Sequence, residues 1–235
     1  MQDIHSAFFL ALGLIASGDA GLWHIILLSL EVTLSAVIFG CAIGIPGAAL
    51  LVVVRFPGKT ALIALLNAFM GLPPVVVGLT VYLLLSRAGP LGELGLLYSV
   101  PAMIIAQTVL VAPLIAALAR QIIADLYEEY DEFFRSLGVG RWRMARALVW
   151  DARFSLITVA LAGFGRAIAE MGAVIIVGGN INNATRVMTT TIALETSKGN
   201  LALALALGVV LVGLAVAVTS AVMALRGTAS RLAYA

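Results

Sequence analysis

Two ionisable residues, Arg166 and Glu170, lie four positions apart within the apolar run 154–178. If this run is an α-helix, both side chains fall on one face, where they can meet. Arg166 then lies about a dozen residues, roughly 18 Å, into a membrane span, where arginine costs about 2.5–3.5 kcal/mol and should face protein or water. Two interpretations stay open. The pair neutralises itself and packs helices, or Arg166 supplies positive potential for a dianion while Glu170 holds the guanidinium.

A second site of possible chemistry is a pair of prolines, Pro73 and Pro74, in the middle of the apolar run 60–86, with Gly71 and Gly78 on either side. Proline removes a backbone donor and clashes with the preceding turn, so carbonyls near Phe69 to Gly71 should lose their partners. In a bilayer this is tolerated only where protein or water satisfies them. We therefore predict a break that forms part of a transport pathway or gate, with a structural kink as the alternative.

No other pattern of enzyme or cofactor chemistry stands out. The chain has no Gly-x4-Gly-Lys-Ser/Thr phosphate loop, so energy from ATP has to come from a partner. His5 and His24 lie near the amino terminus without a cluster of metal ligands. No serine, cysteine or carboxylate pair has a convincing catalytic neighbour, and the basic residues are too dispersed for a nucleic-acid face. We expect no cofactor on this chain.

The composition predicts the elements that position these residues. The chain is 62% hydrophobic and 11% charged, whereas soluble domains are about a quarter charged. Bilayer-length apolar runs lie near 24–54, 60–86, 98–119, 154–178 and 201–225. The sequence therefore predicts one all-α integral membrane domain, residues 1–235, with about five transmembrane helices. Residues 5–18 are too short to span and are expected to form an interfacial or partial helix, with a cleaved signal peptide as the less favoured alternative.

The basic residues predict the orientation. With the amino terminus outside, ten Lys and Arg residues face the cytoplasm and three face outward. The cytoplasmic set is Arg55, Lys59, Arg120, Arg135, Arg141, Arg143, Arg146, Arg153, Arg226 and Arg231. The outer set is Arg87, Arg186 and Lys198. This positive-inside bias places the carboxyl terminus in the cytoplasm.

The longest polar interruption is the cytoplasmic loop of about 121–153. An apolar stripe at helical spacing runs along its first part, formed by Leu126, Tyr130, Phe133, Phe134 and Leu137. Acidic residues come early and Arg135 late, as a helix dipole favours, and Gly138 can supply a left-handed turn. Residues 141–150 read as a second helix. We call residues 125–150 the bracket; its periodicity also fits a connector lying on lipid headgroups, although its five acids suit a protein partner better than an anionic leaflet.

The bracket resembles the cytoplasmic "EAA" loop of ABC importer permeases through Glu132, Leu137-Gly138 and Arg141-Trp142. Phe133 and Phe134 replace the two alanines, and Trp150-Asp151 stands where Leu-Pro is usual. MGLPPVVVGL (70–79) with the following RAGPLGELG, and GRAIAEMGAVIIVGGN (165–180), resemble molybdate and tungstate permeases. TRVMTTTIALETSKGN (185–200) is most similar to the tungstate permeases.

This resemblance, which runs from about residue 30 to the last span, implies a homodimer in the membrane of a prokaryote. Each subunit would dock on a cytoplasmic ABC ATPase dimer, and an extracytoplasmic binding protein would deliver an oxyanion. ATP hydrolysis is expected on the separate ATPase subunit. The residues implied in coupling are Glu132, Phe133, Phe134, Arg135, Leu137 and Gly138.

An outer polar segment, residues 178–200, is the last candidate. Its amide and hydroxyl groups could pass an oxyanion inward or dock the binding protein, while a solvated loop accounts for the same composition. These groups belong to Asn180, Asn182, Asn183, Thr185, Thr189, Thr190 and Thr191. Gly178-Gly179 should let the chain leave the preceding helix.

The resemblance favours import of tungstate or molybdate by alternating access, with sulfate or phosphate as other oxyanions. A stand-alone secondary transporter is a less favoured alternative, because it needs a coupling-ion site, for which Glu31 and Glu170 are the candidates. A membrane-bound enzyme has no identifiable active site in this sequence.

Overall fold

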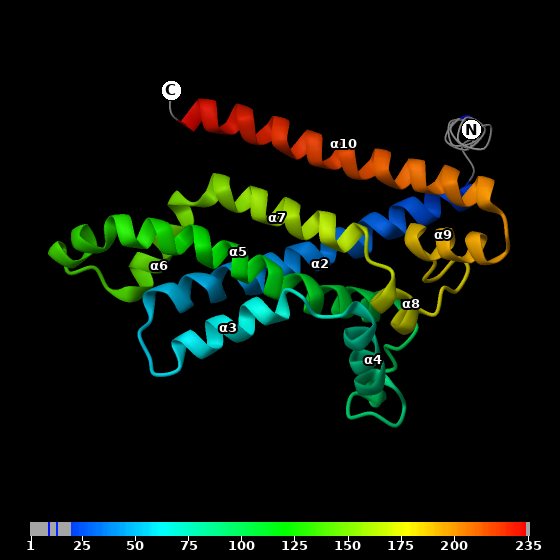
Figure 1. Ribbon diagram of the computed structural model, residues 1–235, viewed down its shortest axis with the longest axis horizontal. Coiled ribbons are helices and arrows are strands. Elements are labelled where there is room, and N and C mark those ends of the chain that lie inside the picture. Colours follow the sequence, from blue (N-terminus) through cyan, green and yellow to red (C-terminus); the bar gives the residue numbers. More distant parts are fainter. Residues whose placement is uncertain (1–8, 10–12, 14–19, 234–235) are drawn as a thin grey trace. The chain divides into compact units, whose positions relative to one another are not determined.

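The structure is a computed structural model that describes residues 9, 13 and 20–233 (Figure 1). Most of the predicted interfacial segment 5–18 lies outside the described residues. Every regular element of the described chain is helical, which confirms the predicted all-α class. The elements are α2 (Ala20–Val53), α3 (Lys59–Phe69), α4 (Pro74–Leu85), η1 (Gly92–Leu94), α5 (Val100–Ser136), α6 (Arg141–Asp151), α7 (Arg153–Ile168), α8 (Gly172–Gly178), α9 (Met188–Ser197) and α10 (Leu201–Ala233).

Three of these helices are long and apolar enough to cross a membrane, namely α2, α5 and α10 as far as Gly227. Two broken pairs, α3 with α4 and α6 with α7, raise the number of candidate spans among the described residues to five. The predicted count of about five is therefore confirmed. The run 154–178 is not one helix, however, because α7 ends at Ile168 and the seven-residue α8 follows separately.

The chain forms two compact units. Unit 1 contains the chain up to Ser35, Pro74–Gln107 and Ile168–Leu225. Unit 2 contains Ala36–Pro73, Thr108–Ala167 and the chain from Arg226. The helices α2, α5 and α10 each contribute residues to both units. Unit 1 thus holds α4, α8 and α9, whereas unit 2 holds α3, α6 and nearly all of α7.

Unit 1 is held together by close packing of short helices on longer ones. The helices α4 and α8 lie against each other (Figure 1), and a Cβ added to Gly78 would come within 2.7 Å of the Ala173 Cα. Glycine is therefore required where these two backbones meet. Elsewhere in the unit, an apolar cluster joins α2, α9 and α10 through Leu22, Ile26, Met188, Ala206, Leu207 and Val210.

In unit 2, glycines let α2 and α7 approach α5 closely. A Cβ on Gly44 would lie 3.0 Å from the Ala112 carbonyl oxygen, and one on Gly163 would lie 2.9 Å from the Ile115 Cδ1. Small residues at such crossings allow van der Waals contact between helix backbones, which is the main source of helix association in lipid. The long α5 is thereby fixed as the central helix of this unit, and its last turns carry the first half of the bracket.

Candidate functional sites

The proline pair marks the end of one helix and the start of another. Helix α3 ends at Phe69, and Pro74 is the first residue of α4, where its missing N–H costs nothing. The predicted break is confirmed. The expectation that carbonyls from Phe69 onward lose their partners is wrong for Phe69, because its oxygen accepts the Leu72 N–H at 3.3 Å. Gly71 and Pro73 lie exposed in the connecting turn.

The start of α8 brings together three of the residues predicted for the pathway: Pro74, Glu170 and Thr189. A Cβ on Gly172 would lie 3.4 Å from both the Pro74 Cβ and the Glu170 Oε1. Glu170 is 5% exposed, and its Oε1 accepts the Ala173 N–H at 3.3 Å. The Thr189 hydroxyl donates to the Glu170 carbonyl oxygen at 3.0 Å. Glu170 therefore caps α8 and links it to α9.

Arg166 and Glu170 do not share a helix face. Arg166 is half-buried in the last turn of α7, where the helix dipole favours a cation. Glu170 lies two residues beyond the end of that helix, so the two residues are not neighbours on one continuous helix, and their pairing stays a prediction. A role for Arg166 toward an anion remains a prediction.

The outer polar segment is more ordered than a solvated loop. Its second half is the helix α9, and the Thr190 hydroxyl accepts the Val187 N–H at 3.1 Å while donating to the Val187 carbonyl oxygen at 3.0 Å. The Met188 N–H donates to the Ser29 hydroxyl of α2 at 2.9 Å. Thr190 is fully buried. Its hydroxyl and that of Ser29 thus satisfy backbone groups at the start of α9.

The turn between α8 and α9 is closed in the same way. Gly179 has a φ of +70° and ends α8, as predicted for the Gly178-Gly179 pair. The buried Thr185 hydroxyl accepts the Ile181 N–H at 3.0 Å and donates to the Gly178 carbonyl oxygen. We call residues 170–200, which contain α8, α9 and their connections, the junction.

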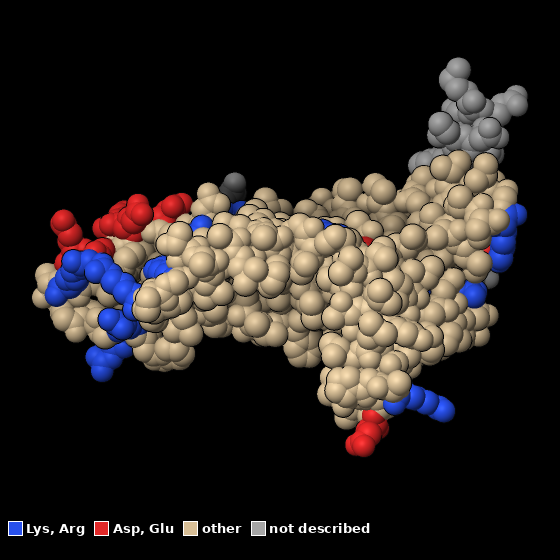
Figure 2. Space-filling view, turned by 60° about the horizontal axis from the view of Figure 1, so that its bottom comes forward, with Lys and Arg blue, Asp and Glu red and all other residues tan. Residues whose placement is uncertain are grey.

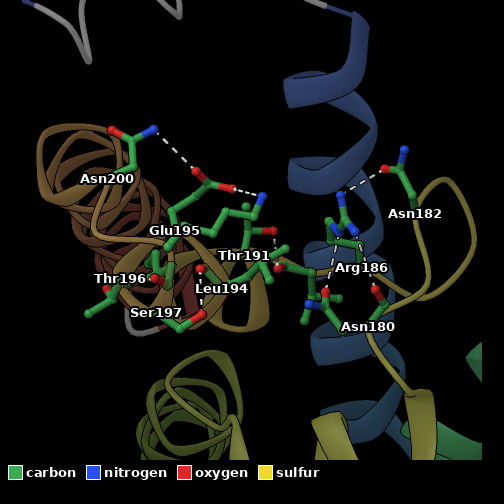
Figure 3. Close-up of polar contacts among 12 residues, drawn as sticks. Asn180, Asn182, Arg186, Thr191, Leu194, Glu195, Thr196, Ser197 and Asn200 are labelled. Carbon is green, nitrogen blue, oxygen red and sulfur yellow. Dashed lines mark hydrogen bonds and ion pairs between the residues drawn. The ribbon is translucent and has the colours of Figure 1, made fainter.

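Arg186 organises the exposed part of the junction (Figure 3). Its Nη1 donates to the Asn182 Oδ1 at 3.0 Å, and its Nε donates to the Asn180 Oδ1 at 3.3 Å. Asn180 has a φ of +50°, a conformation that asparagine adopts more readily than most residues. Sequence reasoning counted Arg186 only as an outer charge. Its position among three asparagines was the available signal that it binds amide oxygens.

A second polar cluster lies at the end of α9 (Figure 3). The Lys198 Nζ lies 2.8 Å from the Glu195 Oε1, and the Asn200 amide donates to the Glu195 Oε2 at 3.2 Å. The hydrogen bond from Lys198 lowers the pKa of the Glu195 carboxyl below its usual range. These contacts tie the last turn of α9 to the start of α10.

The bracket has the predicted helix, turn and helix. The Leu137 N–H donates to the Phe133 carbonyl oxygen at 3.2 Å, and the Val139 N–H donates to the Phe134 carbonyl oxygen at 3.1 Å. Gly138 adopts a φ of +61° between them, which is the left-handed helix end that its position predicted. Helix α6 then begins at Arg141.

The surface of the bracket carries both exposed apolar rings and charges. Phe133, Leu137 and Trp142 are 61%, 60% and 71% exposed. Phe134, by contrast, is half-buried with its ring 6.1 Å from that of Tyr130. The charged side chains gather over the ends of α5 and α6 (Figure 2), and they include a pair between Asp131 and Arg135. Large exposed apolar groups set among charges are typical of a protein-binding surface. Glu132 is exposed on the same helix.

Among residues 9, 13 and 20–233, no group of three or more His, Cys, Asp or Glu side chains is placed to hold a metal ion. The geometry described above offers two candidate sites of another kind. The first is the bracket in unit 2, and the second is the junction with Pro74 in unit 1.

Comparison with known proteins matches residues 36–226 to the family described as the binding-protein-dependent transport system inner membrane component. The tungstate uptake system permease protein of Peptoclostridium acidaminophilum is 37% identical over 226 residues, which cover 96% of this chain and 99% of that protein. The probable anion ABC transporter permease protein of Haloferax volcanii is 36% identical over 213 residues, covering 87% and 92%. The molybdenum transport system permease protein of Escherichia coli K12 is 33% identical over 172 residues, covering 70% and 75%.

Proposed function

Because this chain belongs to the family of inner membrane components of binding-protein-dependent transport systems, we propose that it is the permease subunit of an ATP-driven importer for tungstate. The observation that carries this proposal is the similarity to a tungstate uptake permease along nearly the whole of both chains. The similarity to a molybdenum permease covers less of this chain, so molybdate is the second candidate. Sulfate and phosphate are the remaining oxyanions to be tested.

The bracket is the part of this chain that we assign to coupling with a cytoplasmic ATPase dimer. Phe133 in the last turn of α5 and Leu137 just after its end are exposed beside the turn at Gly138. Apolar side chains of this kind can fill a cleft on a partner, while Glu132 and Arg135 meet its surface. Two copies of the chain, each with one bracket, would let closure of the ATPase dimer pull the brackets together.

The orientation follows from the same assignment. The bracket and most of the basic residues lie in the cytoplasm, so the junction faces the extracytoplasmic binding protein. The amino terminus is then outside and the carboxyl terminus inside, in the inner or plasma membrane of a prokaryote.

In unit 1 we assign the translocation path to Pro74 and the start of α8, and Gly71 and Pro73 of unit 2 stay predicted residues of the path. Glu170 and Thr189 connect α8 to α9 here, so a movement of α4 against α8 would be transmitted to the junction. Asn180 and Thr190 belong to the same segment. Arg166, at the end of α7, supplies positive potential for a divalent oxyanion.

The test is ATPase activity of the permease reconstituted in liposomes with its ATPase and with a loaded binding protein. Tungstate, molybdate, sulfate and phosphate are compared as the load. Stimulation by tungstate-loaded protein above the other three supports the proposal. Equal stimulation by sulfate or phosphate contradicts the assignment of tungstate as the substrate. Failure of any ATPase to associate contradicts the proposed coupling function of the bracket.

The role of Arg166 is tested in the same liposomes. Arg166→Gln should lower the tungstate transport rate by tenfold or more, whereas Arg166→Lys, which keeps the charge, should retain more of it. Arg87→Gln, which removes a charge on the outer side, is the matched control. Native transport by Arg166→Gln contradicts an electrostatic role.

A further inference from the structure

Unit 2 contains a groove of about 840 Å³ between α2, α6 and α7. Part of its lining comes from the second half of the bracket, but the proposed coupling contacts at Phe133 and Leu137 lie outside it. It has two kinds of wall. One is basic and aromatic, and the other is aliphatic. The lining residues are Ile45, Arg143, Arg146, Ala147, Val149, Trp150, Arg153, Leu156, Ile157 and Ala160.

The basic wall is one face of α6. Arg143, Arg146 and Trp150 recur at spacings of three and four, so they project on the same side of the helix. The opposite side of α6 is buried against unit 2 through Met144, Ala145 and Leu148. Arg143 and Arg146 are therefore exposed because the packing of α6 turns them outward. Among the residues that the structure describes, none that lines the groove is acidic.

The third arginine is held at the edge of the membrane span. Arg153 is the first residue of α7, and its guanidinium lies 4.6 Å from the Phe154 ring and 5.0 Å from the Trp150 ring. Its Nη1 donates to the Trp150 carbonyl oxygen at 2.8 Å, which leaves further N–H groups for another acceptor. Trp150 is 71% exposed. Exposed tryptophan beside arginine at the end of an apolar helix is the composition found at membrane interfaces.

The aliphatic wall extends away from these charges along the span. Leu156, Ile157 and Ala160 follow Arg153 on α7, and Ala160 lies seven residues on, about 10 Å along the helix axis. Helix α6 is bent by 74° from α7. If α7 crosses the bilayer, α6 therefore runs closer to its plane, with the arginines at headgroup level and the aliphatic wall at the depth of acyl chains.

We propose that this groove binds one anionic phospholipid, with its phosphate among Arg143, Arg146 and Arg153 and an acyl chain along Ile45, Leu156 and Ile157. An ATPase that docks at the surface would meet the arginines but would leave the aliphatic wall empty. A soluble anion would use only the charges. A phospholipid matches both walls, because its charged and apolar parts are joined in this order. Only the assignment to the cytoplasmic leaflet rests on the proposed function.

The consequence for the protein is that a bound lipid fixes α6 at the membrane surface. Because α6 is the second half of the bracket and follows the Gly138 turn directly, the lipid would hold that half of the bracket in place. The site is therefore a structural lipid site next to the coupling surface, and it is distinct from the path of the transported oxyanion.

The test is native mass spectrometry of the full-length chain with phosphatidylglycerol or phosphatidylcholine of the same acyl chains, without ATPase or oxyanion. We expect one phosphatidylglycerol to be retained with about tenfold or greater preference. Arg143→Gln with Arg146→Gln should remove this preference. Arg55→Gln with Arg141→Gln removes the same amount of charge from exposed positions outside the groove. This control variant should keep the preference for phosphatidylglycerol.

A second variant tests the aliphatic wall without changing charge. Ala160→Phe fills the groove and should weaken retention of phosphatidylglycerol, whereas Ala162→Phe, on an exposed face of the same helix, should not. Melting curves of both variants check that they fold. If Ala160→Phe does not fold, the variant with Arg143→Gln and Arg146→Gln tests the proposal instead. Equal retention of the two lipids, equal loss in the two charge variants, or displacement by millimolar inorganic phosphate would overturn the proposal. Full retention by a folded Ala160→Phe would also overturn it. Because no transport component is present, failure of this test leaves the proposed function untouched.

Discussion

In the bracket, Phe133 and Leu137 are 61% and 60% exposed, whereas in the junction Thr185 and Thr190 are 1% and 0% exposed. Both segments interrupt an apolar chain with polar residues. The turn of the bracket is closed mainly by backbone bonds around Gly138, joined by the Ser136 hydroxyl on the Phe133 carbonyl oxygen, and Phe133 and Leu137 stay exposed. The junction uses its hydroxyls to satisfy backbone groups. Similar departures from apolar composition therefore leave apolar groups exposed in one segment, where we propose that they bind a partner, and satisfy backbone groups in the other.

If this comparison is right, the largest effect on function should come from substitutions in the bracket. Phe133→Asp with Leu137→Asp should lower association with the ATPase about 100-fold or more, because exposed anchors at the centre of an interface carry most of the binding free energy. The melting temperature of the purified chain should hardly change. The measurement is copurification of the ATPase together with a thermal melt in detergent.

Leu94→Asp is the control for that variant, since Leu94 is equally exposed at 60% but lies in η1 of unit 1. It should bind the ATPase normally. Unchanged association of the double variant would show that the exposed apolar groups of the bracket have another purpose.

The second prediction concerns the packing of α4 against α8, the first helix of the junction. Gly78→Ala would place a methyl group 2.7 Å from the Ala173 Cα, so α8 has to shift and the free energy of unfolding should fall by about 1–3 kcal/mol. Gly213→Ala, where nothing lies within 4 Å of the added Cβ, should be neutral or slightly stabilising. Thermal melts of both variants measure the difference. Equal melting temperatures would mean that α4 and α8 do not constrain each other.

Thr190→Val, the third variant, tests whether the junction hydroxyls stabilise the fold. It removes the acceptor for the buried Val187 N–H while keeping the shape of the side chain, and should cost about 1–2 kcal/mol. The exposed Thr196→Val loses only a bond to its own helix and serves as the control. If both variants melt alike while Thr190→Val stops transport, Thr190 contacts substrate and the comparison with the bracket fails.

The same contrast explains what the sequence could predict. The bracket was predicted nearly residue by residue because its signals are local: apolar spacing, acids before Arg135, and a glycine at the helix end. Tyr130 and Phe134 of the predicted stripe lie four residues apart, and their rings contact each other as that spacing predicts. The stripe did not predict that Phe134 is half-buried while Phe133 and Leu137 are exposed.

The junction was predicted less well because its signals are tertiary. Hydropathy does not register the break between α7 and α8, so 154–178 read as one span and Arg166 and Glu170 as helix neighbours. The break is stabilised by the Ala173 N–H on Glu170 and by Thr189 from α9, which are contacts that periodicity does not reveal. Likewise, the prolines predicted the break, but they did not predict that the helix beginning at Pro74 packs on α8.

The smallest effect is expected at the exposed end of the junction, for Lys198→Met. Lys198 holds the pKa of Glu195 below its ordinary value, so their interaction stabilises the fold above the ordinary pKa and is lost as pH falls through the lowered one. The variant should melt at most about 1 °C below the native chain at pH 7, since an exposed ion pair contributes little. As pH falls through the lowered pKa of Glu195 the difference should vanish, because the carboxylate becomes protonated. A large loss at pH 7 would instead mean that this surface pair, like the buried hydroxyls, is part of what stabilises the junction.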